Sequence, residues 1–463
     1  MRKEATQEDR YQQMMNEPVE RLVIRFAVPT IISMMVTAIY NMADTYFVSQ
    51  INTQASGAVG VIFSLMAFIQ AIAFMIGMGS GNHISRLLGQ QKKKQAEVFA
   101  AVCFFTEFGA GLLIAVLLVC NLDRVVFLLG ATDTIAPYAR DYARYILYAA
   151  PFMMCAFGMN NMLRFQGNAF YAMIGITAGG ILNIILDPIF IFGLGLGISG
   201  AAIATGFSQC VSFGILLLQS NLRKSCLSIR LRNFRPTASI YGKILQSGFP
   251  SLGRQGIASI AVILLNFAAK PFGDAAIAAM SIVSRYGNFI NSATIGFGQG
   301  FQPVCGFNYG AGHYDRVMRA FSFCVRTATK VLIVLAVISF ALAVPIITEF
   351  RRDDAAVIAI GTQALRLQAL TLPFAGYITM ANMFTQTTGY GIRATIVSVL
   401  RQGIYFIPLI LVLPRTLGLY GILLTQPIAD ALSVVTAYFI CRGILREMNE
   451  KRRQQVGKEE EPV

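Results

Sequence analysis

Charged residues are scarce in this chain. They make up 13% of its 463 residues, against roughly 25% in an average soluble protein. Tryptophan is absent, and there are only two histidines. This shortage of charge, together with a hydrophobic fraction of 55%, argues against a soluble enzyme, a disordered protein or a nucleic-acid-binding module.

Motifs of enzymes and metal sites are also missing from the sequence. There is no GxxxxGKS/T loop for ATP, no HExxH and no GxSxG, which are the usual marks of ATPases, metallopeptidases and serine hydrolases. The eight cysteines are scattered and form no CxxC pair, so no zinc site is indicated. We therefore expect no catalytic residues, no cofactor, no bound metal centre and no ATPase subunit.

Long apolar segments are what the sequence does contain. Most are long enough to cross the hydrocarbon core of a bilayer as a helix, which takes roughly 20 residues. They lie at 26–48, 55–80, 98–121, 142–162, 170–193, 198–220, 244–269, 275–300, 322–349, 364–386, 394–414 and 418–441. The pattern predicts an all-α polytopic membrane protein with twelve transmembrane helices.

The basic residues predict how these helices are oriented. Lys and Arg concentrate in the segments that are cytoplasmic if both termini lie inside, such as 92–94 and 221–239. Cytoplasmic loops of membrane proteins carry such an excess. We therefore expect a multi-pass protein of a bacterial inner membrane, with both termini in the cytoplasm.

The two halves of the sequence resemble each other. Pro29 and Pro250 are 221 residues apart, as are Gly197 and Gly418, and Gly167 and Gly389 are 222 apart. Each pair occupies an equivalent place in the order of helices, so we predict two six-helix lobes related by a pseudo-two-fold axis along the membrane normal. The predicted segments are a cytoplasmic N-terminal segment (1–20), an N-lobe (21–220), a cytoplasmic linker (221–240), a C-lobe (241–443) and a cytoplasmic tail (444–463).

Four acidic residues lie inside apolar segments, where a charge is costly and usually functional. They are Asp44, Glu107, Asp187 and Asp430. Asp44 and Asp187 both fall late in helices that run outward, so they can share one cavity in the N-lobe. Asn41 and Asn183 lie three and four residues before them, on the same helix faces. For Glu107 a structural role is as good an interpretation as a functional one, and for Asp430 we favour an interhelical hydrogen bond.

The pair of aspartates is suited to ion exchange. Apolar surroundings and a nearby second carboxylate both favour the neutral form of a carboxyl group, so such a pair can take up and release a proton near physiological pH. The same oxygens, with amide and hydroxyl neighbours, can instead hold sodium. Both acids can also be purely structural hydrogen-bonding groups between helices.

Several motifs together resemble those of the multidrug and toxic compound extrusion (MATE) family over residues 18–445, and most of all its MepA-like bacterial branch. They include NMADTYFV around Asp44, GMGSGNHISRLLGQ, LNIILDPIFIF around Asp187, GFGQGFQPVCGFNYGAGHYDRV, TQTTGYG and GLYGILLTQPIAD. The resemblance implies a two-lobed transporter that alternates between inward-open and outward-open states. It further implies export of diverse, often cationic polyaromatic compounds against inward proton or sodium flow, and hence antibiotic resistance.

The resemblance also implies site residues in the N-lobe. The polar network of the family matches Asp44, Asn183, Asp187 and Thr205, and these are our candidates for ion or proton coupling. The candidates for the substrate cavity are Met34, Thr37, Tyr40, Asn41 and Asn160. Some members of the family carry acids in helices 7 and 10, but the corresponding segments here contain none, which favours coupling in the N-lobe.

Other functions stay open at this stage. A lipid-linked saccharide flippase, or an exporter of an endogenous metabolite, can share the architecture, and a membrane receptor or scaffold is the third alternative. The expected partners are small-molecule drugs or organic cations and membrane lipids, without nucleic acid, and we expect a monomer.

Overall fold

The structure of the chain is a computed structural model that describes residues 7–221, 227–351 and 354–459. Part of the predicted linker (222–226), the first residues of the predicted N-terminal segment (1–6) and the end of the predicted tail (460–463) lie outside the described residues. The described chain divides into two compact units. Residues up to 17 and 25–248 form the N-terminal unit, and residues 18–24 and 249 onward form the C-terminal unit.

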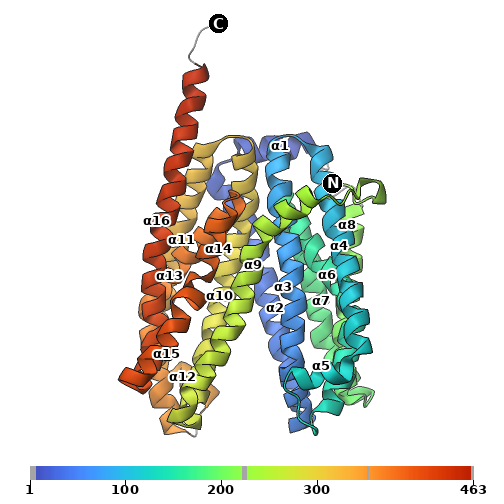
Figure 1. Cartoon of the computed structure of the whole chain (residues 1–463), viewed down its shortest axis with the longest axis vertical. Coiled ribbons are helices and arrows are strands. Elements are labelled where there is room, and N and C mark those ends of the chain that lie inside the picture. The colour runs from blue at the N-terminus through green and yellow to red at the C-terminus, as the bar shows by residue number, and fades with distance from the viewer. Residues whose placement is uncertain (1–6, 222–226, 352–353, 460–463) are drawn as a thin grey trace. The chain divides into compact units, whose positions relative to one another are not determined.

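The N-terminal unit is built of helices (Figure 1). In chain order they are α1 (Gln7–Asn16), α2 (Val19–Ser49), α3 (Thr53–Gly89), α4 (Lys93–Cys120), α5 (Leu122–Leu128), α6 (Ala136–Phe165), α7 (Ala169–Pro188), the π-helical turn η1 (Ile189–Gly193), α8 (Gly197–Asn221), the 3-10 turn η2 (Leu231–Asn233) and the start of α9 (Ala238–Ala269). Most of α6 is buried, and it packs against α3, α4, α7 and α8. It is therefore the central helix of this unit.

The C-terminal unit repeats this plan. After α9 come the 3-10 turn η3 (Lys270–Phe272), α10 (Asp274–Gly310), α11 (Tyr314–Ala341), α12 (Ala343–Phe350), α13 (Ala355–Thr387), α14 (Gly391–Val399), the π-helical turn η4 (Leu400–Ile404), α15 (Phe406–Leu417) and α16 (Leu419–Glu459). Here α13 is the central helix and packs against α10, α11, α14 and α16. The boundary between the units falls at Gly248, inside α9.

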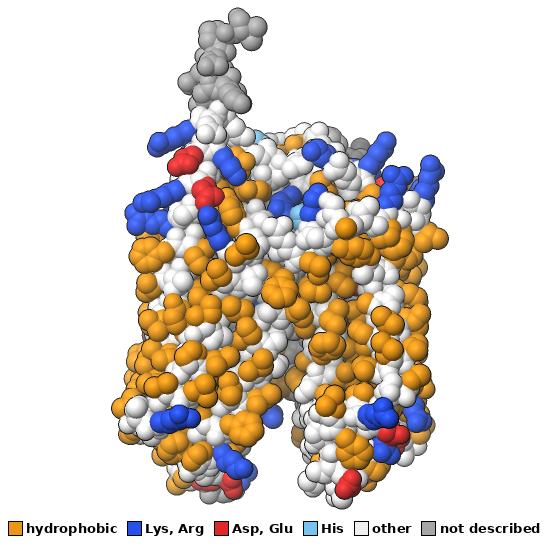
Figure 2. Space-filling view, in the orientation of Figure 1, with side chains coloured by type: hydrophobic (Ala, Val, Ile, Leu, Met, Phe, Trp, Pro, Cys, Tyr) orange, Lys and Arg blue, Asp and Glu red, His pale blue; other side chains and the backbone are white. Residues whose placement is uncertain are grey.

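Within the described residues, eleven helices are long and apolar enough to cross a membrane. The twelfth long helix, α10, spans 37 residues but carries Arg285 and several Ser, Asn and Gln residues that lower its hydropathy. Figure 2 shows hydrophobic side chains over the middle of each unit and Lys and Arg side chains near its ends. The predicted all-α, twelve-helix, two-lobed fold is confirmed.

The helices are longer than the apolar runs that predicted them. The segment expected at 55–80 is part of α3, which continues to Gly89, and the one expected at 418–441 is part of α16, which continues to Glu459. Polar residues extend these helices beyond the apolar runs, because backbone hydrogen bonding does not end where hydropathy falls. The predicted segment 322–349 is divided between α11 and the short helix α12.

The internal repeat is visible in the backbone. Gly167 and Gly389 have φ values of 82° and 89°, in the left-handed region that glycine adopts without strain. At the turn after α3, Gln91 has a φ of 58°, and Gly312, which lies 221 residues later, has a φ of 81°. The two halves therefore share turn geometry even where the residue types differ.

A side-chain contact is repeated as well. The amide nitrogen of Asn160 donates to the carbonyl of Ala172 at 2.9 Å, and that of Asn382 donates to the carbonyl of Ala394 at 3.3 Å. Both residues of the second contact lie 222 positions after those of the first. Asn160 and Asn382 thus link the fourth and fifth long helices of their own units in the same way.

Candidate ion-coupling and substrate site in the N-terminal unit

Asp44 lies late in α2 and faces the central helix of the unit. The hydroxyl of Tyr142, in α6, donates to Oδ2 of Asp44 at 3.2 Å. Tyr142 is completely buried, so its hydroxyl has no access to bulk water. The contact therefore fixes one oxygen of Asp44 inside the unit.

Asp187 lies at the end of α7 and is also completely buried. Its Oδ1 accepts a hydrogen bond of 3.0 Å from the amide nitrogen of Asn183, one turn earlier. The same amide nitrogen donates to Oγ1 of Thr205, in α8, at 3.2 Å. The i, i+4 spacing that was noticed in the sequence thus places the amide directly on the acid.

Tyr142 joins these two groups into one polar cluster. Its hydroxyl also interacts with Thr205, and both aspartates act on it electrostatically. The two aspartates interact with each other as well. The structure therefore brings together all four predicted coupling residues, Asp44, Asn183, Asp187 and Thr205, through a tyrosine that the sequence analysis did not select.

Three oxygen atoms of the cluster have no hydrogen-bond donor among the described residues. They are Oδ1 of Asp44, Oδ1 of Asn183 and Oδ2 of Asp187, and all three are buried. Buried polar atoms in proteins almost always have a partner. A proton on a carboxyl group, or a small cation between the oxygens, would satisfy them. No set of three or more His, Cys, Asp and Glu side chains suited to a metal ion occurs in the described residues, so a sodium ion would need the amide and hydroxyl oxygens too.

The backbone next to Asp187 departs from regular α-helix. Pro188 has no N–H to donate, and α7 gives way directly afterwards to the π-helical turn Ile189–Gly193. Short π-helical turns are uncommon and occur often at functional sites. A departure from regular α-helix is thus present beside the acid.

Glycines allow α7 to approach its neighbours closely around the cluster. A Cβ atom at Gly180 would come within 2.9 Å of Val36 and 3.1 Å of Tyr40, both in α2. A Cβ atom at Gly179 would come within 2.9 Å of the Ser212 side chain in α8. The small residues of α7 therefore hold the helices that carry the coupling residues next to one another.

The predicted substrate-cavity residues lie in different surroundings. Tyr40 is buried near Asp44, and its hydroxyl interacts with Gln209 of α8. Met34, Thr37 and Asn41 are half-buried on α2, and the Thr37 hydroxyl donates to the Ser33 carbonyl at 2.8 Å. Asn160 uses its amide nitrogen in the contact with α7 described above. Tyr40 is thus the one whose side chain acts on the acidic cluster, and the cavity role of all five stays a prediction.

Two residues of the cluster were missed from the sequence. Tyr142 begins an apolar segment among several other tyrosines, and Gln209 lies 221 positions before Asp430 within another apolar segment. Only the packing of α6 and α8 against α2 distinguishes them. A partial signal was available for Gln209, since it is a polar side chain within an apolar run.

Glu107, in α4, is the second fully buried acid of the N-terminal unit, with Asp187, among the described residues. Its side chain is completely buried, and the thiol of Cys103, one turn earlier, interacts with its carboxyl group. The carboxyl group lies over Gly158 of α6, so that a Cβ atom at Gly158 would overlap it. Glu107 therefore fills the gap that a glycine leaves between two helices, away from the contacts of Asp44 and Asp187 described above.

We predict that Gly158→Ala destabilises the protein, because the new methyl group displaces the Glu107 carboxyl group from a closely packed position. Overpacking of this kind costs about 1–3 kcal/mol. Gly109→Ala, in α4, is the matched control, since a Cβ atom there meets no other atom within 4 Å. The measurement is the melting temperature of the purified variants. Glu107→Ala should restore part of the loss in the double variant, and equal melting temperatures for the two glycine variants would contradict this packing.

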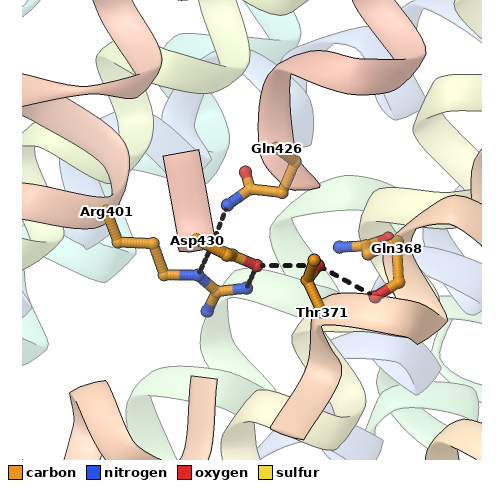
Figure 3. A network of polar contacts seen from close by, with 5 residues as sticks. All are labelled: Gln368, Thr371, Arg401, Gln426 and Asp430. Atoms are coloured by element: carbon orange, nitrogen blue, oxygen red, sulfur yellow. Dashed lines mark hydrogen bonds and ion pairs between the residues drawn. The ribbon is translucent and has the colours of Figure 1, made fainter. Parts of the chain in front are cut away.

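Asp430 lies in the C-terminal unit and forms the interhelical contact that the sequence favoured, but with a charged partner (Figure 3). Nε of Arg401, in η4, donates to Oδ1 of Asp430 at 2.6 Å, and Nη2 lies 3.3 Å from Oδ2. The amide nitrogen of Gln426 donates to Oδ1 at 2.7 Å, and the hydroxyl of Thr371, in α13, lies 3.5 Å from Oδ2. The Asp430 charge is therefore neutralised within its own unit.

The seventh and tenth helices, α9 and α13, carry no acidic residue in their described lengths. Arg254, in α9, instead points its Nη1 at the amide oxygen of Asn382 in α13, at 3.4 Å. The buried acids that lack a charged partner are thus those of the N-terminal unit, among the described residues. This distribution keeps the candidate coupling site there.

Comparisons with known proteins agree with this architecture. The MatE family model matches residues 29–189 and 250–412, one region in each half. The Multidrug export protein MepA of Staphylococcus saprophyticus is 26% identical over 419 residues, which cover 90% of this chain and 92% of that protein. The protein of the same name from Staphylococcus haemolyticus is 26% identical over 428 residues, with coverages of 91% and 92%. A solved outward-facing multidrug resistance MATE family transporter of the MOP superfamily has a TM-score of 0.90 and 26% identity, and covers 95% of this chain and 98% of its own.

Twelve long helices in two similar units, with buried acids in the first, define a polytopic membrane transporter rather than an enzyme. The chain belongs to the MatE family, since the family model covers well over half of it. The family membership that the sequence motifs implied, with similarity to MepA, is confirmed.

Proposed function

We propose that this protein exports diverse, often cationic and polyaromatic, small molecules in exchange for protons or sodium ions. Its relatives that bear the name Multidrug export protein MepA support the substrate class. The observation that carries the mechanism is the buried cluster in which Tyr142, Thr205 and Asn183 join Asp44 to Asp187.

The cluster gives a reason for exchange. When a carboxylate of the pair is ionised, it attracts a cation into a poorly solvated place, where the attraction is stronger than in water. When the pair is neutralised by a proton or by sodium, the attraction is lost and the cationic substrate is released. The ion and the substrate therefore compete for the same oxygens, and each binds a different state of the protein, which coupling requires.

Helix α2 is the element that we expect to move in this cycle. Pro29 removes one backbone hydrogen bond from it. The hydroxyls of Thr30 and Ser33 donate to the carbonyls of Phe26 and Pro29 at 2.9 and 3.0 Å, and such bonds often bend helices. Because Asp44 and Tyr40 lie on the same helix, a change of bend near Pro29 alters the surroundings of the acid.

The orientation in the membrane is part of the proposal. The even number of long helices supports a position of both termini on one side of the membrane, and the excess of basic residues in the predicted inner segments supports the cytoplasm as that side. The bacterial relatives support the cytoplasmic membrane of a bacterium as the location.

The test is dye efflux from proteoliposomes with one imposed ion gradient at a time. We expect a pH gradient or a sodium gradient to drive accumulation of a cationic dye such as rhodamine 123, with little transport when neither is present. Transport under only one gradient identifies the coupling ion. The absence of transport under both gradients would refute the proposal, and selective movement of a lipid-linked saccharide would favour a flippase instead.

A further inference from the structure

The C-terminal unit contains a small cavity next to the Arg401–Asp430 pair. Its volume is about 80 Å³, and its polar lining side chains are Asn288, Asn291, Gln368, Arg401, Gln402 and Gln426, with Ser284 and Thr294. A water molecule takes about 30 Å³ of liquid, so the cavity accommodates a group of a few heavy atoms. Pockets for whole drug-sized ligands measure roughly 300–1,000 Å³, so only a part of such a molecule would fit.

The two members of the ion pair are covered to different extents. The Asp430 side chain is only 1% exposed, because Arg401, Gln426 and Thr371 surround its oxygens. The Arg401 side chain is 19% exposed and lines the cavity. Its third guanidinium nitrogen takes no part in the contacts with Asp430 (Figure 3). The cavity therefore faces a guanidinium group rather than the carboxylate that neutralises it.

The rest of the lining supplies hydrogen-bond donors without negative charge. Amide and hydroxyl groups make up its other polar side chains, and no acidic side chain is among the described residues that line it. Arg401 also sits in the π-helical turn Leu400–Ile404, a backbone feature that is frequent at functional sites. A guanidinium surrounded by amides is suited to an anionic oxygen group, since arginine donates hydrogen bonds in a fork that matches a carboxylate.

The internal repeat relates this cavity to the polar cluster of the N-terminal unit. The lining residues Ala261, Leu265 and Gln426 lie 221 positions after Tyr40, Asp44 and Thr205, which belong to the cluster in the N-terminal unit. The cavity is thus the counterpart of that cluster in the second unit. At this counterpart position the carboxylate of Asp44 is replaced by an apolar side chain. Arg401 stands where the first half has a glycine, which is Gly179 at the offset of 222 that relates α7 to α14 and Gly180 at an offset of 221.

We propose that the cavity beside Arg401 is a binding site for an anionic group no larger than a carboxylate or a halide ion. The site rests on a duplicated cluster in which an arginine paired with an aspartate takes the place of two aspartates without a charged partner. It also rests on the proposed function, which it deepens by giving the carboxylate of a zwitterionic substrate a place to bind. The carboxylate would lie in the cavity and accept hydrogen bonds from Arg401 and the neighbouring amides, while its ring system stays outside.

Two dyes that differ in one group provide the test. Rhodamine 110 has a free carboxylate, and rhodamine 123 is its methyl ester. Binding of each to the purified full-length protein is measured by fluorescence polarisation. Free halide is tested separately, by the melting temperature in sodium chloride and in sodium gluconate at equal ionic strength. Competition of chloride with rhodamine 110 shows whether a free anion and a ligand carboxylate use the same place.

Two variants distinguish a loss of anion binding from a loss of folded protein. Arg401→Gln combined with Asp430→Asn removes both charges and keeps amide groups in place, and Asn291→Leu changes the lining while the ion pair is intact. We expect each to weaken rhodamine 110 binding at least tenfold and to change rhodamine 123 binding less than twofold. The stabilisation by chloride should disappear in the double variant.

The outcomes distinguish this proposal from the proposed function. The proposed anion site is wrong if the variants weaken the binding of both dyes equally. It is also wrong if wild-type protein binds rhodamine 123 but neither rhodamine 110 nor chloride. If neither dye binds but chloride stabilises the wild type and not the double variant, the anion site stands and the proposed drug export fails. The absence of any dye binding and of any chloride effect would overturn both.

Discussion

Asp44→Asn and Asp187→Asn will each reduce dye efflux to background while leaving the amount of folded protein unchanged. An asparagine keeps the size and most hydrogen bonds of the aspartate but can neither take up a proton nor attract a cation. A ligand that binds two conformational states equally tightly does not change their populations. Each variant therefore loses the contact that couples binding of the ion to binding of the substrate. The measurement is accumulation of rhodamine 123 in cells that express each variant at equal levels.

The matched control for this prediction is Asp123→Asn. Asp123 lies in α5 and is also an aspartate with a partner, since it pairs with Arg140 at 2.6 Å, but its side chain is 76% exposed. We expect its loss to leave efflux at the wild-type rate, because an exposed ion pair contributes roughly 0–1 kcal/mol and lies outside the cluster. Undiminished efflux by both of the asparagine variants in the cluster would refute the role of the two acids.

Asp430→Leu will destabilise the protein strongly, because it leaves the Arg401 guanidinium beside an apolar group with no counter-charge. Removal of one partner of a buried ion pair costs about 3–5 kcal/mol. Replacement of both partners, by Asp430→Leu with Arg401→Met, should restore most of the stability, since apolar residues of similar volume often replace a buried pair without loss. The melting temperatures of the three proteins in detergent measure this difference.

The comparison between the single and the double variant decides the result. If the double variant melts as low as Asp430→Leu, the pair contributes its own stability and the unpaired charge is not the cause of the loss. If the single variant melts like the wild type, Asp430 does not neutralise Arg401 in the folded protein. The first result would contradict the explanation of the loss by an unpaired charge, and the second would contradict the ion pair drawn in Figure 3.

Hydropathy was enough to predict the long helices, because a bilayer demands about 20 apolar residues for each crossing. It was not enough to place their ends. Helix α3 continues to Gly89 through His83 and Arg86, where His83 contacts the carbonyl of Lys243. Such contacts depend on neighbouring helices, and the sequence of one helix does not contain them.

The candidate site was predictable to the extent that single helices determine it. Asp187 and Asn183 lie one turn apart on α7, so their contact follows from helix geometry alone. The contact between Asp44 and Tyr142 joins residues 98 positions apart and depends on how α2 and α6 pack. Tyrosine carries no charge that would mark it in an apolar segment, and this is why Tyr142 was missed.

The Arg401–Asp430 pair is another contact between helices that the sequence does not predict. Asp430 was noticed in the sequence as an acid inside an apolar segment, but Arg401 lies in a different helix, and nothing in the spacing of 29 residues links the two. The π-helical turn at Leu400–Ile404 contributes to where Arg401 points, and apolar runs do not reveal such turns. An acid and a base that would each be unfavourable alone in an apolar segment can therefore neutralise each other in the folded protein.

The central claim is that substrate and coupling ion compete for the oxygens of Asp44 and Asp187. Its most direct test is the release of protons, read with a pH indicator in weakly buffered detergent solution, or of bound sodium, when purified protein binds rhodamine 123. The account predicts release of one of these ions from wild-type protein and none from the Asp44→Asn, Asp187→Asn double variant. Equal release from both proteins, or dye binding to the wild type without release of either ion, would contradict it.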